Sequence, residues 1–253
     1  MDNLSPNFAR IQIFKEVKTQ KVYLRVVKQI EELIENGKLK PGDRLPPEKI
    51  LAKKLGVSRP SVREAIVALE ILGFVETRGG KGNFVKNVVS ASVLDQGFRN
   101  LEEEESPFEL LQARKIIEGE IAGYAARMAE KEDLGRIRQS LDNMRNIAQK
   151  PSNPEKFDQH VKLDLEFHLS IARATHNAVL LRMVTQLFES LKEDLWTSFK
   201  KRSWSIPGIL QRYLMEHEQI LSAIEAKQSY QARKRMHKHL TGVQKDLFGK
   251  LRD

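Results

Sequence analysis

The most constraining feature of this chain is a turn-rich run that separates two helix signals in its first third. Pro47 stands at a position suited to the first turn of a helix, and Gly56 ends that helix. Ser58 then offers its hydroxyl to the amide of Ser61, an N-cap arrangement that opens a second helix over residues 58–72. Two short helices joined this tightly predict a helix-turn-helix.

Further elements complete this small unit on both sides. Apolar residues recur at steps of three and four over residues 23–36, which predicts an amphipathic helix. Residues 74–85 indicate two short strands joined by a glycine-rich basic turn, which together form a wing. Two interpretations of the wing stay open: Arg78 and Lys81 approach a DNA groove, or the hairpin only completes the small core.

Two arginines near the start of the second predicted helix, Arg59 and Arg63, lie one turn apart. On a helix that enters the major groove, such side chains reach guanine edges or phosphates with paired donors, so we expect both to be exposed. The alternative is that they pair with acids such as Glu64 or Glu70 on an ordinary solvated helix. Ser61 is a further candidate contact.

Basic charge is concentrated in the same part of the chain. The 253 residues carry a formal net charge of +9, and residues 1–85 hold 16 Lys and Arg against 10 Asp and Glu. This is the electrostatic footprint of a protein that meets phosphate backbones. Cysteine is absent, which excludes disulfides and thiolate metal sites. No window is apolar over the roughly 20 residues that a membrane span needs, so we expect a soluble, cytoplasmic protein with no membrane partner.

These residues and their spacing closely resemble the winged helix-turn-helix of the GntR family of bacterial transcription regulators. The matching positions are Gly37, Leu45-Pro46-Pro47-Glu48, Val57-Ser58-Arg59, Val62-Arg63-Glu64-Ala65, Leu69, Gly73, Gly80 and Val85. The resemblance implies that double-stranded DNA is the partner. The candidate DNA-binding residues are Lys49, Ser58, Arg59, Ser61, Arg63, Arg78, Gly79 and Gly80. Lys49 stands where the family usually has arginine, so we expect a phosphate contact there in place of a paired contact to a base.

The rest of the chain predicts a second, all-helical domain. Residues 86–105 lack periodicity and end in four glutamates, which indicates a linker. Ser106 then gives an N-cap, with Pro107 at the first helical position. Helical patterns follow over 106–129, 132–149, 154–174, 178–200, 208–226 and 229–251, and no strand is convincing.

The predicted fold class is therefore mainly α. A winged helix-turn-helix occupies residues 1–85, with residues 1–18 as a flexible tail. Residues 86–105 link it to an all-helical bundle at residues 106–253, which is expected to bind a metal and an effector and to dimerise.

Histidine is confined to the second domain. Asp164 and His168 lie one helical turn apart and so project from one face, while His217 and His239 fall on two later helices. Three imidazoles and one carboxylate suit Zn²⁺, Mn²⁺, Fe²⁺ or Ni²⁺ better than calcium or magnesium. Scattered histidines are more often surface or hydrogen-bonded core residues, and that ordinary role is assigned to His160, His176 and His237.

The second domain resembles the C-terminal ligand-binding (FCD) domain of the FadR subgroup of the same family. The matching residues are Leu111-Gln112-Ala113-Arg114, Ile117-Glu118, Ala125-Ala126, Asp164 to His168, His217, Ala223-Ile224 and Ala232 to Leu240. The resemblance implies a divalent metal, with zinc most expected, on Asp164, His168, His217 and His239. It also implies that Arg114 clamps an effector carboxylate through a forked pair. The alternative for Arg114 is a pairing with Glu118, four residues further on.

The resemblance implies a cytoplasmic homodimer that regulates transcription at a palindromic operator. We expect a repressor released by a small organic acid, and no enzymatic activity. Two alternatives stay open: a metal-dependent hydrolytic enzyme fused to a DNA-binding domain, and a metal-free regulator that senses an acyl thioester. An adjacent His-Asp pair typical of helical phosphohydrolases is missing, which argues against the enzyme.

Overall fold

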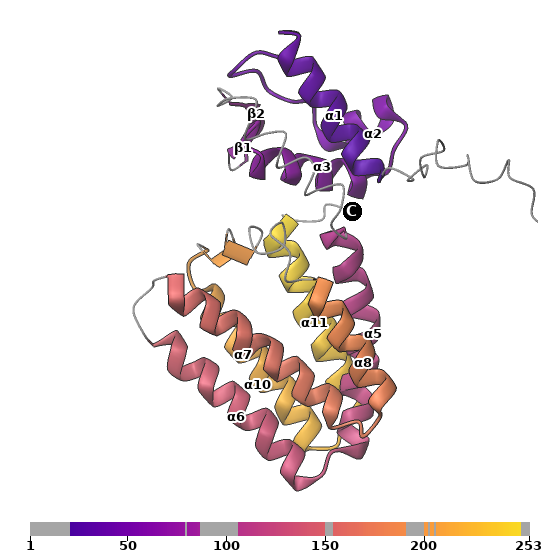
Figure 1. Cartoon of the computed structure of the whole chain (residues 1–253), viewed down its shortest axis with the longest axis vertical. Helices are drawn as coiled ribbons and strands as arrows, with labels where there is room; N and C mark the ends of the chain where they lie inside the picture. The colour runs from indigo at the N-terminus through magenta and orange to yellow at the C-terminus, as the bar shows by residue number, and fades with distance from the viewer. Residues whose placement is uncertain are drawn as a thin grey trace, which may run out of the picture.

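A computed structural model of the chain describes residues 21–78, 80–86, 106–149, 154–190, 200–201, 203–204 and 206–248. The described chain is mainly helical, as predicted, with a small N-terminal unit at one end of a bundle of longer helices (Figure 1). The N-terminal unit contains α1 (Val22–Glu35), α2 (Glu48–Leu55), α3 (Arg59–Ile71), β1 (Val75–Arg78) and β2 (Gly82–Val85). The bundle contains α5 (Pro107–Met128), α6 (Lys131–Ala148), α7 (Pro154–Arg173), α8 (Ala178–Ser190), α10 (Ile209–Glu225) and α11 (Ser229–Phe248).

The helix-turn-helix forms because each boundary has its own local cause. Gly56 adopts φ +64°, a left-handed conformation that ends α2 at little steric cost. The next helix begins after Ser58, and Pro60 supplies a preset φ in its first turn. Leu51 and Val62 then pack α2 against α3 in a small apolar cluster, so the two helices are held at a defined angle.

The wing is anchored on both sides of β2. On one side β1 pairs with it antiparallel, with Val75 opposite Val85. On the other side the turn before α2 lies along its edge, where the amide of Leu45 donates to the Asn83 carbonyl at 2.8 Å. Gly82 is required at this crossing, because its φ is +106° and an added Cβ would lie 2.9 Å from Nε of Arg44.

In the bundle, α5 packs closely along α11 (Figure 1). Two glycines one turn apart allow this approach: a Cβ at Gly119 would lie 3.0 Å from the His237 ring, and one at Gly123 would lie 3.2 Å from the Ser229 carbonyl. The helices α6 and α7 pack together, and α10 lies against α6 and α11. The polar residues described below project into the interior of this bundle from α5, α7, α10 and α11.

The predicted helix bounds are close to the observed ones, and two of the predicted helices extend beyond the described residues. The helix expected over residues 178–200 is described as α8 up to Ser190, and residues 191–199 lie outside the described part. The flexible tail, residues 87–105 of the linker, Gly79 of the wing and residues 249–251 of the last predicted helix also lie outside it. No strand occurs among the described residues of the bundle. Within the described helices, none is both long and apolar enough to cross a membrane.

Candidate functional site

The N-terminal end of α3 carries the candidate DNA contacts, and Ser58 caps it as predicted. Its hydroxyl oxygen accepts a hydrogen bond from the Ser61 amide at 3.2 Å, and the two serine hydroxyl oxygens lie 2.9 Å apart. Ser58 is exposed, and Arg59 and Ser61 are half-buried. Lys49, in the first turn of α2, is also exposed. The amides of an accessible helix N-terminus favour a phosphate.

The prediction that Arg63 is exposed is wrong. Its side chain is 6% exposed and makes a forked ion pair with Glu48, with Nε 3.1 Å from Oε1 and Nη2 2.6 Å from Oε2. The cause is the packing of the two helices, which places the first residue of α2 against the second turn of α3. Arg63 therefore holds the helix-turn-helix together, and a DNA contact by this residue stays a prediction.

The two acids expected as possible partners of the arginines make other contacts. Glu70 accepts hydrogen bonds from the amide and hydroxyl of Thr77 in the wing, at 3.3 and 2.9 Å. Glu64 accepts a hydrogen bond from the hydroxyl of Ser106, the N-cap of α5. Both carboxylates tie α3 to its surroundings, one to the wing and the other to the bundle.

The basic tip of the wing is accessible. Arg78 and Lys81 are exposed, and Gly80 adopts a left-handed φ of +71° at the turn. Arg78 pairs with Glu76 at 2.6 Å and lies 4.4 Å from the centre of the Phe84 ring. Such a solvated ion pair contributes little to stability, so the arginine is available to exchange its partner for a phosphate.

The structure brings together three of the predicted metal ligands. One ring nitrogen each of His168 on α7, His217 on α10 and His239 on α11 lie within 4.8 Å of one another, and all three residues are buried. The Nε2 atoms of His217 and His239 are 3.2 Å apart. The Nε2 atom of His168 is buried without a hydrogen-bond partner among the described residues.

Asp164 lies beside this cluster, with one carboxylate oxygen near two of the histidines and the other at Lys200. Oδ1 lies 3.6 Å from Nε2 of His217 and 3.9 Å from Nε2 of His168. Oδ2 accepts a hydrogen bond from the ammonium of Lys200 at 2.7 Å. Burial opposes ionisation of Asp164, but the charge of the Lys200 ammonium outweighs burial and holds the pKa of Asp164 well below its usual value. The group is therefore a carboxylate, the form that ligates a metal.

Two glutamates contact the Nδ1 atoms of His168 and His239 and so orient these two rings. Oε2 of Glu118 lies 2.5 Å from Nδ1 of His168, and Oε2 of Glu216 lies 2.7 Å from Nδ1 of His239. A carboxylate that holds Nδ1–H leaves Nε2 free to ligate, and metal-binding histidines commonly have such partners. Sequence reasoning missed Glu216, because its partner His239 lies on another helix and no local pattern joins the two residues.

Burial keeps the imidazoles of His217 and His239 neutral. Burial and then the proximity of His239 hold the pKa of His217 well below its ordinary value. Burial also lowers the pKa of His239, against the opposing effect of the hydrogen bond that His239 donates to Glu216. Neutral imidazole is the ligating form. The lone-pair nitrogens, the orphaned Nε2 of His168 and the adjacent carboxylate thus fit a divalent transition metal, and the nitrogen-rich donor set favours zinc, nickel, manganese or iron.

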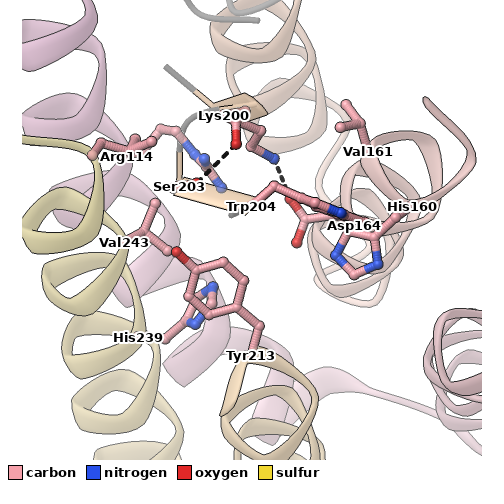
Figure 2. A pocket seen from close by; sticks show the side chains of 11 residues that line it. Arg114, His160, Val161, Asp164, Lys200, Ser203, Trp204, Tyr213, His239 and Val243 are labelled. Carbon is pink, nitrogen blue, oxygen red and sulfur yellow. Dashed lines mark hydrogen bonds and ion pairs between the residues drawn. The ribbon is translucent and has the colours of Figure 1, made fainter. Parts of the chain in front are cut away.

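Arg114 extends into a cavity next to the cluster (Figure 2). The alternative predicted for Arg114, a pairing with Glu118, is present: Nε of Arg114 donates to Oε1 of Glu118 at 2.5 Å. The pair is buried and not on the surface, because Arg114 is 1% exposed. Burial alone would raise the pKa of Glu118, but the contacts with Arg114 and His168 outweigh burial and lower that pKa to about 2. Glu118 is therefore a carboxylate at neutral pH, and its negative charge holds the guanidinium of Arg114.

The cavity is narrow, with a volume of about 20 Å³. Arg114, Asp164 and His239 lie on its wall, and sequence reasoning did not find the residues that complete it: His160, Val161, Lys200, Ser203, Trp204, Tyr213, Val243 and Leu247. Figure 2 shows Lys200 reaching Asp164 from the short segment that also carries Ser203 and Trp204. Lys200 follows no local motif, so no signal in the sequence marked it.

The histidines given an ordinary role differ among themselves. His237 is exposed, and His176 is exposed and pairs with Asp133 at 2.9 Å. His160 departs from the expectation, because it is buried on the cavity wall and its Nδ1 has no hydrogen-bond partner among the described residues.

Comparison with known proteins covers both parts of the chain. Residues 22–85 match the family described as bacterial regulatory proteins, gntR family, and residues 109–242 match the FCD domain. The Uxu operon transcriptional regulator of Escherichia coli (strain K12) is 36% identical over 240 residues, covering 90% of this chain and 88% of the relative. The HTH-type transcriptional regulator LutR of Bacillus subtilis (strain 168) is 35% identical over 227 residues, covering 86% and 97%. The solved structure of Streptococcus agalactiae GntR aligns at 21% identity with a TM-score of 0.45, covering 88% of this chain and 99% of that one.

Proposed function

Because this chain belongs to the GntR family of bacterial regulatory proteins, we propose that it is a metabolite-responsive repressor. The family match and the FCD domain make it a DNA-binding transcription regulator. Its proposed effector is a small organic acid bound beside a divalent metal in the bundle. Its proposed target is an operator on bacterial DNA, so its proposed place of action is the cytoplasm.

The observation that carries the proposal is the shared cavity of Arg114 and the histidine cluster. A buried guanidinium with a forked donor set suits a carboxylate. It stands on the same wall as Asp164 and His239, so one small acid can contact both the arginine and the metal centre. A bound metal supplies a Lewis-acidic centre with coordination positions that a carboxylate fills.

Each protein residue then has a separate task at this centre. The three histidines and Asp164 are the proposed ligands of the metal, with zinc favoured by the donor set. Glu118 and Glu216 hold two of the rings in orientation. Arg114 is the proposed anchor of the effector carboxylate, and Glu118 keeps its fork in place.

DNA recognition is proposed for the accessible end of α3, the start of α2 and the wing. Arg59 and Ser61 are the residues proposed to read the major groove, and Lys49 and Arg78 are proposed to contact phosphates. Arg63 positions α3 through Glu48. These roles rest on the exposure and geometry given above and on the family's winged helix-turn-helix.

A homodimer is proposed because the bundle leaves apolar side chains uncovered on two helices that pack together. Ile116 on α5 is 65% exposed, and Val179 and Met183, one turn apart on α8, are 55% and 43% exposed. A second copy that covers these residues would place two winged helices on the two half-sites of a palindrome. Replacing Val179 with Lys should shift the mass measured by analytical ultracentrifugation toward the monomer.

The test is operator binding measured with and without metal and acid. DNA fragments selected by the metal-loaded protein from a random pool supply the operator. A small hydroxy or sugar acid should weaken binding to it, and removal of the metal by a chelator should abolish the response to the acid. Chemical turnover of the bound acid would support the enzyme in place of the regulator. A response that persists without metal would support the metal-free alternative.

A further inference from the structure

Lys200 holds one oxygen of a carboxylate whose other oxygen faces the histidine cluster. Its ammonium donates to Oδ2 of Asp164 at 2.7 Å (Figure 2), while Oδ1 lies 3.6 Å from Nε2 of His217 and 3.9 Å from Nε2 of His168. The side chain of Lys200 is 16% exposed and that of Asp164 is 10% exposed. The ion pair is therefore largely removed from water, where charges interact strongly with one another.

Lys200 supplies the counter-charge that the Asp164 carboxylate needs at this depth. Burial opposes the ionised form of Asp164, and among the neighbours of this carboxylate Lys200 has the largest opposing effect on its pKa. Arg114 lies on the same cavity wall, but its guanidinium pairs with Glu118. Removing one partner of a buried ion pair leaves an uncompensated charge, which is strongly destabilising. The contact between Lys200 and Asp164 is thus an energetically important one.

A divalent metal at the histidine cluster would be a second positive partner for the same carboxylate. Metal–oxygen distances are about 2.0–2.2 Å, so a metal on Oδ1 would lie less than about 8 Å from the ammonium. At an effective dielectric constant of about 20, repulsion over that distance weakens metal binding on the order of a thousandfold. A residue that orients a ligand typically strengthens metal affinity by about 10- to 100-fold. The repulsion therefore outweighs the benefit of the hydrogen bond that orients Asp164.

We propose that Lys200 sets the affinity of the metal centre, because its ammonium competes with the metal for the charge of Asp164. The lysine either stays beside the metal and repels it, or turns toward solvent and loses its ion pair. Metal binding is weaker in both cases than the four donor groups alone would make it, so the centre fills at a higher free metal concentration. The inference rests on the proposed metal site and gives Lys200 a role separate from that of the ligands.

The first experiment measures the zinc affinity of the full-length protein by competition with a chromogenic chelator. Lys200→Met keeps the chain length without the ammonium, and Lys200→Gln keeps a hydrogen-bond donor without the charge. Both should bind zinc at least about tenfold more tightly than wild type. Lys200→Arg keeps the charge and should stay within about threefold of wild type. Lys201→Met, which removes an exposed charge from the next residue, is the matched control and should bind zinc as wild type does.

A second measurement, thermal unfolding, reports folding and the charge effect together. In the presence of a chelator, Lys200→Met leaves Asp164 without its counter-charge, so the melting temperature should be lower than that of wild type. Saturating zinc should then raise the melting temperature of Lys200→Met by more than that of wild type, because a tighter ligand stabilises the folded state more. A zinc-induced rise equal to or smaller than that of wild type would contradict the proposal.

The affinities of the two neutral variants decide the role of Lys200. Weaker zinc binding by both would overturn the proposal, because it would show that the lysine orients Asp164 for the metal. Unchanged affinity would overturn it as well, since the ammonium would then have no influence on the metal. If Lys200→Met does not fold, Lys200→Gln alone gives the answer. These outcomes leave the metal site in place, whereas a wild-type protein that binds neither zinc, nickel nor manganese would remove the proposed metal site and the inference together.

Discussion

The carboxylate of Glu64 in α3 accepts a hydrogen bond from the hydroxyl of Ser106, which is the N-cap of α5. Burial raises the pKa of Glu64 to about 7, with the Ser106 hydrogen bond acting against burial and the charge of Glu109 adding to it. The same α5 carries Arg114 and Glu118 two to three turns further on. The helix α5 therefore runs from α3 to the effector cavity, and a displacement at Arg114 can reach the DNA-binding unit through α5.

Glu64 should make stability depend on pH. Its folded pKa of about 7 lies above the ordinary 4.5, so its contribution is fully present below pH 4.5 and is lost as the pH rises to 7. Over this range the free energy of unfolding of wild type relative to Glu64→Gln should fall by up to about 3 kcal/mol. Urea unfolding of both proteins at several pH values measures this difference in free energy. A difference that does not change with pH would show that the carboxyl titrates normally.

The ion pair between Arg63 and Glu48 should stabilise the helix-turn-helix. Glu48→Gln leaves the buried guanidinium without a counter-charge and should lower the free energy of unfolding by about 1–3 kcal/mol. Glu76→Gln, which removes the partner of the exposed Arg78, is the control and should change it by less than about 1 kcal/mol. Tighter operator binding by Glu48→Gln would show that Arg63 must leave Glu48 to contact DNA, against the positioning role.

Arg59 should carry sequence recognition. Arg59→Ala should weaken operator binding by about 1–3 kcal/mol and relax the preference at one base pair, which a fluorescence titration with mutated operators would detect. Lys49→Ala should weaken all sequences equally and reduce the salt dependence of binding. If Arg59→Ala keeps both affinity and preference, it makes no base contact.

The metal centre should depend on a ligand and on the residue that orients one. His217→Ala should lose metal, as measured by elemental analysis of the purified protein, while the winged helix-turn-helix stays folded. Glu216→Gln should weaken metal affinity about 10- to 100-fold by releasing His239. Glu218 lies on the same helix, and its described ion pairs are with Arg138 and Arg145. The Glu218→Gln protein is therefore the control and should bind metal normally. Stoichiometric metal in His217→Ala would refute the ligand assignment.

Arg114 should anchor the effector through its fork. Arg114→Lys keeps the charge beside Glu118 but loses the paired donors, so the affinity for the acid should fall about tenfold or more while the metal content is retained. Arg233→Lys is the control, because its partner Glu120 is exposed. Retained acid affinity in Arg114→Lys would place the carboxylate elsewhere in the cavity.

The helices, the cap at Ser58 and the wing were predictable because their causes are local. Apolar spacing, proline, glycine and the N-cap serine act over a few residues, and the structure confirms them within small shifts at the element ends. The grouping of His168, His217 and His239 was predicted only through the family resemblance. Their spacing along the chain does not place three helices side by side.

The amino-acid sequence alone determined the order of helices and strands, the helix-turn-helix and the residue types available to DNA and metal. Only the tertiary structure decided that Arg63 turns inward to Glu48, that Glu216 supports His239, and that Lys200 reaches Asp164. Periodicity shows which residues share a face of one helix. Which neighbour meets that face depends on how whole helices pack, and that packing joins residues far apart in the chain.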